Sequence, residues 1–144
     1  MDTPCSFCRI VRGEAPSLRI AETEGAYAFL DINPATPGHA LVIPKQNRRD
    51  LFDATPDELA ELLALAQRVG AAAMNELGAP GVKLHQVSGA AAGQDVFHLH
   101  FHVIPRYEDD TVQPSWYVDD WTAPDLSEED QAALTRRMTL ALAD

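Results

Sequence analysis

Three of the chain's five histidines stand at alternate positions in one short stretch that ends at Pro105. Because successive side chains of a β-strand point to opposite faces of a sheet, this spacing predicts a strand over residues 97–104 with the three imidazoles on one face. Buried imidazoles need hydrogen-bond partners or a metal, and they titrate near neutral pH, so such a row indicates chemistry rather than packing. The row consists of His98, His100 and His102, and the expected core face consists of Phe97, Leu99, Phe101 and Val103.

Four further segments have the composition of short strands and are separated by turn-forming glycine and proline. Sequential strands joined by short turns favour an antiparallel sheet, which predicts an α+β fold class rather than a wound parallel sheet. A loop of small residues over 89–93 precedes the histidine strand. The four predicted strands are residues 18–23, 26–31, 39–43 and 82–87.

One long helix is predicted between Thr55 and Gly78. Thr55 supplies a hydroxyl N-cap, Pro56 suits the first helical position, and Glu58 completes a capping box. Leucine, alanine and valine recur at helical spacing, so one side of the helix is expected to pack on the sheet, and Gly78 is placed to end it. Ser127 marks the start of a shorter helix toward the C-terminus.

The composition fits one domain. The chain has 144 residues, of which 46% are hydrophobic, and this is enough to bury a core. A net charge of −11 repels polyanions, so we expect no nucleic-acid partner. The sequence has no apolar run of about 18 residues and no basic leader, which favours a cytoplasmic protein without a membrane span. Residues 108–144 form an acidic and aromatic extension that includes Trp116 and Trp121.

The central histidine is the expected nucleophile. An imidazole attacks well at neutral pH when one nitrogen is free and a neighbour holds the other as a donor, and His100 has an imidazole on each side. The small residues that precede the row, including Gly93, leave backbone N–H groups open to an anion. Together these features suit attack on phosphorus.

The row resembles the signature of the histidine triad (HIT) family, in which three histidines alternate with apolar residues. The resemblance covers about residues 5–107, and its motifs occur in the family order. It implies a five-stranded antiparallel sheet with one long helix and short terminal helices, and a homodimer with a continuous sheet. The matching segments are residues 5–10, 28–34, 37–45, 92–94 and 98–104.

The resemblance also implies an activity and a set of roles. His100 would attack an α-phosphorus, form a covalent nucleotidyl-histidine and later release a nucleoside monophosphate, with no cofactor required for catalysis. The substrate would be a small nucleotide, namely a purine nucleoside phosphoramidate or a related adduct. The other implied catalytic residues are His98, His102 and His39, and the implied substrate-binding residues are Asp31 for the ribose, Ile32 for the base, and Gly93, Gln94 and Asp95 near the phosphate.

A structural zinc is a further implication of the resemblance. A C-x-x-C pair in a reducing compartment suggests metal or redox chemistry, and the implied ligands here are Cys5, Cys8 and His98. The fourth ligand is missing, because Asn47 stands where small bacterial members have a histidine, and an amide is a far poorer zinc ligand. We therefore expect any zinc to be weakly held.

Asp95 stands where many members have serine or threonine. An ionised carboxylate accepts hydrogen bonds but cannot donate them, and it repels a phosphate. Either Asp95 turns away to bind a neighbouring backbone N–H or a basic side chain, or it is protonated in place, or the favoured leaving group carries a positive charge. The third alternative predicts a preference for cationic phosphoramidates over polyphosphates.

Three alternatives stay open at this point. The chain could hydrolyse dinucleoside polyphosphates, or bind nucleotides with little turnover. The histidine row could instead ligate a catalytic metal. His85 lies outside every matched motif and is expected to be structural.

Overall fold

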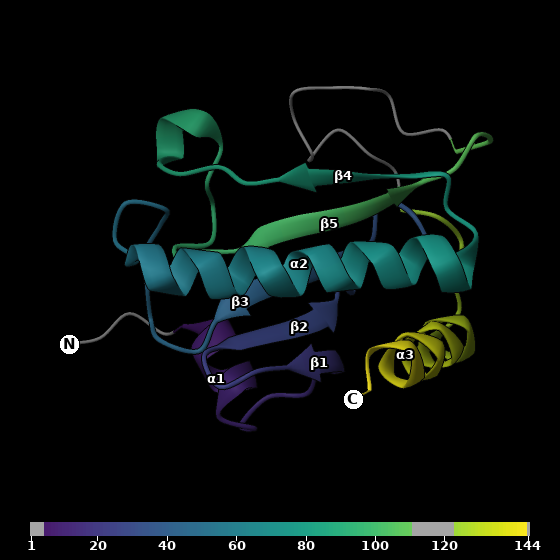
Figure 1. Cartoon of the computed structure of the whole chain (residues 1–144), viewed down its shortest axis with the longest axis horizontal. Helices are drawn as coiled ribbons and strands as arrows, with labels where there is room; N and C mark the ends of the chain where they lie inside the picture. The colour runs from purple at the N-terminus through teal and green to yellow at the C-terminus, as the bar shows by residue number, and fades with distance from the viewer. Residues whose placement is uncertain (1–4, 111–122, 144) are drawn as a thin grey trace.

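The computed structural model describes residues 5–110 and 123–143, and within these ranges five strands form one antiparallel sheet (Figure 1). Their order across the sheet is β1-β2-β3-β5-β4. The predicted α+β class and five-stranded antiparallel sheet are therefore confirmed. The strands are β1 (Leu18–Glu22), β2 (Ala26–Leu30), β3 (Ala40–Pro44), β4 (Gly81–His85) and β5 (Phe101–Arg106), and the helices are α1 (Ser6–Val11), α2 (Pro56–Leu77), α3 (Glu128–Leu142) and the short 3₁₀ turn η1 (Ala90–Ala92).

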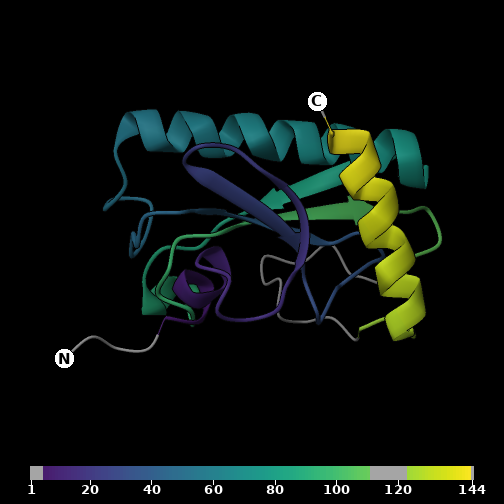
Figure 2. The same cartoon turned by 90° about the horizontal axis from the view of Figure 1, so that it is seen from below.

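Helices α2 and α1 cover opposite faces of the sheet, as Figure 2 shows with α2 above the sheet and α1 below it. The main core lies under α2, where its apolar stripe packs on the strands. A smaller cluster under α1 joins the other face of β2 and β3 to Phe7, Ile10 and Val11. The sheet is therefore buried on both faces at its centre.

Strand β5 begins later than the sequence predicts, at Phe101 instead of residue 97. The N–H of Leu99 donates to the carbonyl of Arg48 (2.7 Å), in the loop that follows β3, instead of to a neighbouring strand. The chain therefore joins the sheet only after His100, because a long-range loop contact uses the backbone group that a ladder would need.

The alternation of side chains is nevertheless kept along the row. Leu99, Phe101 and Val103 all lie in the core under α2. The prediction was wrong for Phe97, which is 40% exposed and lies beneath the guanidinium of Arg49, 4.4 Å from the ring centroid. Phe97 precedes the strand, so the strand's two-residue period does not place it.

Strand β5 also continues through Pro105 to Arg106. The carbonyl of Pro105 accepts from the hydroxyl of Thr36, and the N–H and C=O of a strand residue point to the same side. The proline nitrogen therefore faces the β3 side, where pairing with β5 ends at Val103. The missing N–H costs no ladder bond at this position. The other strands lie within two residues of their predicted bounds.

The predicted capping of the long helix is confirmed. The Thr55 hydroxyl accepts from the N–H of Glu58, and the Glu58 carboxylate accepts from the N–H of Thr55. Gly78 ends α2 in the left-handed region at φ +71°, where a glycine carries no Cβ penalty. Ser127 and Asp130 form the same kind of box at the start of α3.

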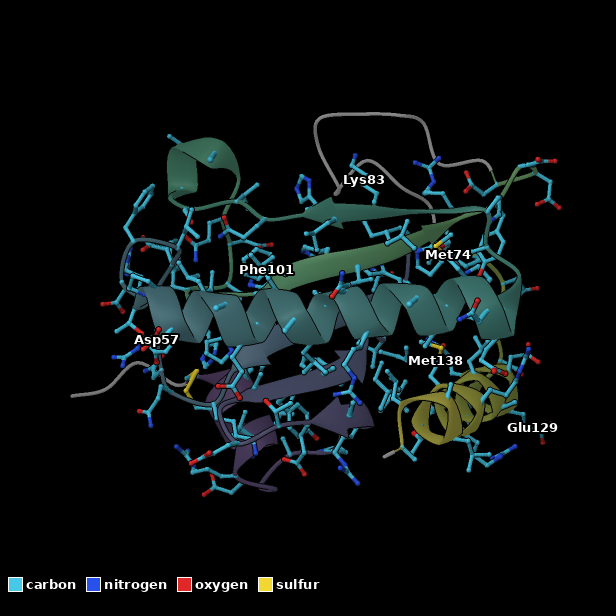
Figure 3. All side chains as sticks on the ribbon, in the orientation of Figure 1. Asp57, Met74, Lys83, Phe101, Glu129 and Met138 are labelled. Atoms are coloured by element: carbon cyan, nitrogen blue, oxygen red, sulfur yellow. A yellow bond between two sulfur atoms is a disulfide. The ribbon has the colours of Figure 1, made fainter. Side chains whose placement is uncertain are left out.

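Helix α3, which belongs to the predicted extension, packs into the main core through the buried side chains of Met138 and Leu142. Figure 3 shows Met138 between α2 and α3. Trp116 and Trp121 lie outside the described residues. Across the described ranges, no helix combines the length and the apolar character that a membrane crossing requires.

Candidate active site

The nucleophile candidate is held in one tautomer by a backbone group. Nδ1 of His100 lies 2.8 Å from the carbonyl oxygen of His98. A carbonyl only accepts, so Nδ1 carries the hydrogen and the lone pair of the neutral ring is on Nε2. This is the form in which an imidazole attacks an electrophile. The ring also meets the edge of Phe7 on α1, with centroids 5.4 Å apart, so helix packing fixes its plane.

A chain of hydrogen bonds sets the tautomers of two further histidines. The N–H of Ala35 donates to Nδ1 of His39 (2.9 Å), so the hydrogen of this ring is on Nε2. That Nε2–H donates to Nδ1 of His102 (2.9 Å), which leaves the hydrogen of His102 on its own Nε2. His102 therefore brings a donor, and His100 an acceptor, to neighbouring positions whose ring centroids are 5.1 Å apart.

Burial keeps this pair neutral. Desolvation, followed by the repulsion of the imidazole of His85, lowers the pKa of His39 to about 3. Desolvation and the imidazoles of His39, His100 and His85 lower the pKa of His102 to about 2. Both values lie far below neutral pH, so the chain of hydrogen bonds does not change its protonation there.

A carboxylate borders the histidines. Oδ2 of Asp31 lies 3.6 Å from Nε2 of His39, and Oδ1 accepts from the N–H of Asn33 (2.9 Å). Burial raises the pKa of Asp31, and the hydrogen bond from Asn33 partly offsets this rise. Asp31 thus presents a mostly buried acceptor, held in place by the turn after β2.

These groups open into a cavity of about 360 Å³. One part of its lining is apolar and comes from α1, β1 and β2, and the other part carries the polar groups. Ile32 stands at the cavity with 85% of its surface exposed. A larger cavity of about 510 Å³, lined in part by Thr36, Tyr107 and Arg137, contains none of the predicted site residues. The acidic and imidazole side chains that line the smaller cavity are Asp31, Asp95, His100 and His102.

Comparison with known families agrees with this geometry. The family model of the HIT domain matches residues 12–109, a range that holds Asp31, Asp95 and all three histidines of the row. The chain belongs to the HIT domain family. The family resemblance read from the histidine row is thereby confirmed.

Individual relatives cover most of this HIT domain. The chain is 46% identical over 109 residues to an uncharacterised HIT-like protein of Mycobacterium tuberculosis, across 76% of each protein. It is 38% identical over 109 residues to an adenosine 5'-monophosphoramidase of Saccharomyces cerevisiae, across 76% of this chain and 66% of that protein. A solved Zn-bound histidine triad family protein from Mycobacterium smegmatis superimposes with a TM-score of 0.83 at 40% identity, covering 96% of this chain and 93% of that one.

Two predicted phosphate-site residues of the HIT domain lie away from the cavity lining. Gln94 is buried, and its amide donates to the carbonyls of Arg49 (2.8 Å) and Val96 (3.0 Å) and accepts from the N–H of Gly89 (2.7 Å). Gly93 ends η1 in the left-handed region at φ +102°. The side chain of Gln94 thus holds the loop together in this structure.

His85 is a site neighbour that sequence reasoning missed. It stands opposite His102 in the β4–β5 register, with ring centroids 5.8 Å apart. Only that register places it among the site histidines of the HIT domain. The register of β4 against β5 cannot be predicted from the sequence, because a long connection joins the two strands. The alternation within β4 predicts only which of its own side chains share a face.

The cysteine pair of the HIT domain lies against the first histidine of the row. Cys5 and Cys8 are joined by a disulfide (yellow bond in Figure 3), and their Sγ atoms lie 3.2 Å and 3.5 Å from Nδ1 of His98. Nε2 of His98 lies 2.9 Å from the carbonyl of Pro44, so it carries the hydrogen and the Nδ1 lone pair faces both sulfurs. Reduced, this set would offer a metal two thiolates and one oriented imidazole.

A second group of ligand-type side chains joins Asp31, His39 and His102. It is a poor metal site, because Nδ1 of His39 is taken by the Ala35 N–H and Nε2 therefore carries a hydrogen. In the described ranges neither this group nor the cysteine group includes His100. The row of the HIT domain therefore does not converge on one catalytic metal, which removes the support for that alternative.

Proposed function

We propose that this HIT domain is a nucleotide hydrolase that cleaves nucleoside phosphoramidates, or related adducts of a nucleoside monophosphate, through a covalent bond to His100. The observation that carries the proposal is the tautomer of His100. Its Nδ1–H donates to the carbonyl of His98, so the lone pair is on Nε2, and the side chain lines the cavity. Similarity to the yeast adenosine 5'-monophosphoramidase supports the same reaction class.

In the first step, Nε2 of His100 attacks the α-phosphorus and a P–N bond to the ring forms. The bond to the leaving nitrogen breaks with its electron pair, and this nitrogen takes a proton from solvent water and departs as the neutral amine. In the second step, water attacks the same phosphorus and releases a proton to solvent, which balances the proton taken up in the first step. The P–N bond to the ring breaks, its electron pair returns to Nε2, and the nucleoside monophosphate leaves. The His98 carbonyl stabilises the positive ring through Nδ1–H, and Nε2–H of His102 donates to a phosphoryl oxygen. In this proposal, both steps use only side-chain and backbone groups of the protein, the substrate and water.

The rest of the cavity suits the nucleoside. Its apolar part, which includes Phe7, Leu18 and Phe29, offers a surface for a base. Asp31 supplies the acceptor that ribose hydroxyls need, beside the turn that carries the exposed Ile32. An apolar side chain that is 85% exposed without a ligand gains by covering a base.

The test is a panel of adenosine and guanosine phosphoramidates and dinucleoside polyphosphates, each mixed with the protein. Release of the nucleoside monophosphate is followed by chromatography, and the reaction is stopped in denaturant for intact-mass measurement. We expect monophosphate release from at least one phosphoramidate, and a transient mass increase of one nucleoside monophosphoryl group on His100. Tight nucleotide binding with no product would contradict the proposal and favour a binding protein.

We further propose that the reduced cysteine pair binds zinc weakly, through Cys5, Cys8 and His98. The oriented Nδ1 of His98 supports this, as does the Zn-bound relative from Mycobacterium smegmatis. Asn47→His adds the missing imidazole and should raise zinc affinity by about tenfold or more, together with the melting temperature in zinc.

Zinc affinity is measured by competition with a chelator under reducing conditions. Gln46→His, at the adjacent exposed position, is the matched control and should leave the affinity unchanged. Full zinc occupancy of the natural protein after chelator dialysis would show that three ligands already hold the metal firmly.

We also propose that two copies pair through the side of the sheet that carries β4. Strand β4 is at the edge of the sheet in the described residues, and a groove of about 360 Å³ lies between it and α2. Leu63, Met74 and Leu84 line this groove and are 45–50% exposed, so they offer an apolar surface that a second copy would cover. Sedimentation velocity should give a dimer for the natural protein and a monomer for Leu84→Glu, whereas a monomeric natural protein would refute the pairing.

A further inference from the structure

The cavity beside His100 is lined by acidic side chains and by no lysine or arginine among the described residues. Its charged lining residues are Asp31 and Asp95. The neighbouring His39 and His102 are neutral, because burial lowers the pKa of each ring to about 3 and about 2. The cavity lining therefore offers a phosphate substrate hydrogen-bond donors and acidic groups but no cationic side chain among the described residues.

Asp95 has no partner of its own within the described ranges. Its side chain is exposed at the cavity, and it forms no hydrogen bond or ion pair there. The arginines of the adjoining loop are engaged elsewhere, since Arg48 pairs with Glu58 (3.0 Å) and the guanidinium of Arg49 covers Phe97. No side chain in the described region offsets the negative charge of Asp95.

The backbone around Asp95 is held firmly. The preceding residue, Gln94, makes three hydrogen bonds to the backbone at Gly89, Arg49 and Val96. These bonds hold the backbone on both sides of Asp95, so the exposed carboxylate stays attached at the cavity lining and can turn only about its own side-chain bonds. A carboxylate that lines the same cavity as His100 acts on whatever charge the substrate places beside it.

We propose that Asp95 selects substrates whose leaving group carries a positive charge, such as an alkylamine chain that ends in an ammonium group and is joined through a P–N bond. This inference rests on the proposed function and names its substrate class. A protonated amine would pair with Asp95, whereas the further phosphates of a polyphosphate would add negative charge beside it. Because the carboxylate is exposed, the preference should weaken as salt is added.

The test compares two adenosine phosphoramidates of equal length, one made from 1,6-diaminohexane and one from hexylamine, together with diadenosine tetraphosphate. We expect kcat/KM to favour the diamine compound over the hexylamine compound by about fivefold at low salt. In Asp95→Asn this ratio should fall to about one, and kcat/KM for the polyphosphate should rise relative to both. Glu24→Gln removes an exposed charge outside the cavity lining and should keep the natural ratio.

A natural ratio of one or less, or an unchanged ratio in Asp95→Asn, would overturn the inference. Failure of the proposed function is a separate outcome, in which no compound yields a nucleoside monophosphate. In that case the same comparison is made by calorimetry, with the dissociation constants of the two phosphoramidates for the natural protein and Asp95→Asn. Charge selectivity in binding would support the role of Asp95, and its absence would refute it.

Discussion

Replacement of His100 by alanine is expected to lower turnover by about 10⁴-fold or more while nucleotide binding persists. The side chain supplies the Nε2 lone pair that attacks phosphorus, and loss of a nucleophile acts on the transition state rather than on ground-state binding. Turnover is measured as single-turnover release of nucleoside monophosphate, and nucleotide binding is measured by calorimetry with the monophosphate.

The control for this prediction is stability, because His100 is buried and contacts Phe7. Denaturant unfolding of His100→Ala must show a folded protein before the kinetic loss is assigned to chemistry. A folded variant that retains near-natural turnover would remove His100 from the mechanism.

Gln94→Ala is expected to lower the free energy of unfolding by about 2–4 kcal/mol. The substitution removes three hydrogen bonds of a buried amide, to the N–H of Gly89 and the carbonyls of Arg49 and Val96, and each such bond contributes about 0.5–1.5 kcal/mol. Denaturant unfolding measures the loss.

Gln86→Ala is the matched comparison. Among the described residues, that amide donates only to the neighbouring Val87 carbonyl and Ser88 hydroxyl, and it is half-buried, so its loss should cost less than about 1 kcal/mol. If Gln94→Ala unfolds like the natural protein and loses only activity, the amide acts on the substrate and not on the loop.

Features with a local cause were predictable from the sequence. The capping box of Thr55 and Glu58 lies within one turn of helix, and the alternation of Leu99, Phe101 and Val103 follows from the pleat alone. The family resemblance then identified the long-range partner His39, which no local pattern would have joined to the row.

Features that depend on loop-to-loop contacts were not predictable. The late start of β5 reflects the bond from Leu99 to Arg48, and the role of Gln94 reflects its bonds to Arg49 and Gly89. Composition says nothing about such contacts, because any backbone carbonyl can accept them. The position of His85 beside His102 likewise required the β4–β5 register.

The hydrogen bond from Ala35 to His39 has a consequence for what this position tolerates. The donor is a peptide N–H, which does not titrate and which nineteen of the twenty amino acids supply equally. Proline is the exception, because it has no N–H to give. As far as this hydrogen bond is concerned, proline is the one amino acid that position 35 must avoid, and proline there would let the His39 ring exchange its donor and acceptor edges. An inventory of side chains at the site would never reveal this requirement, because the group that enforces it belongs to the main chain.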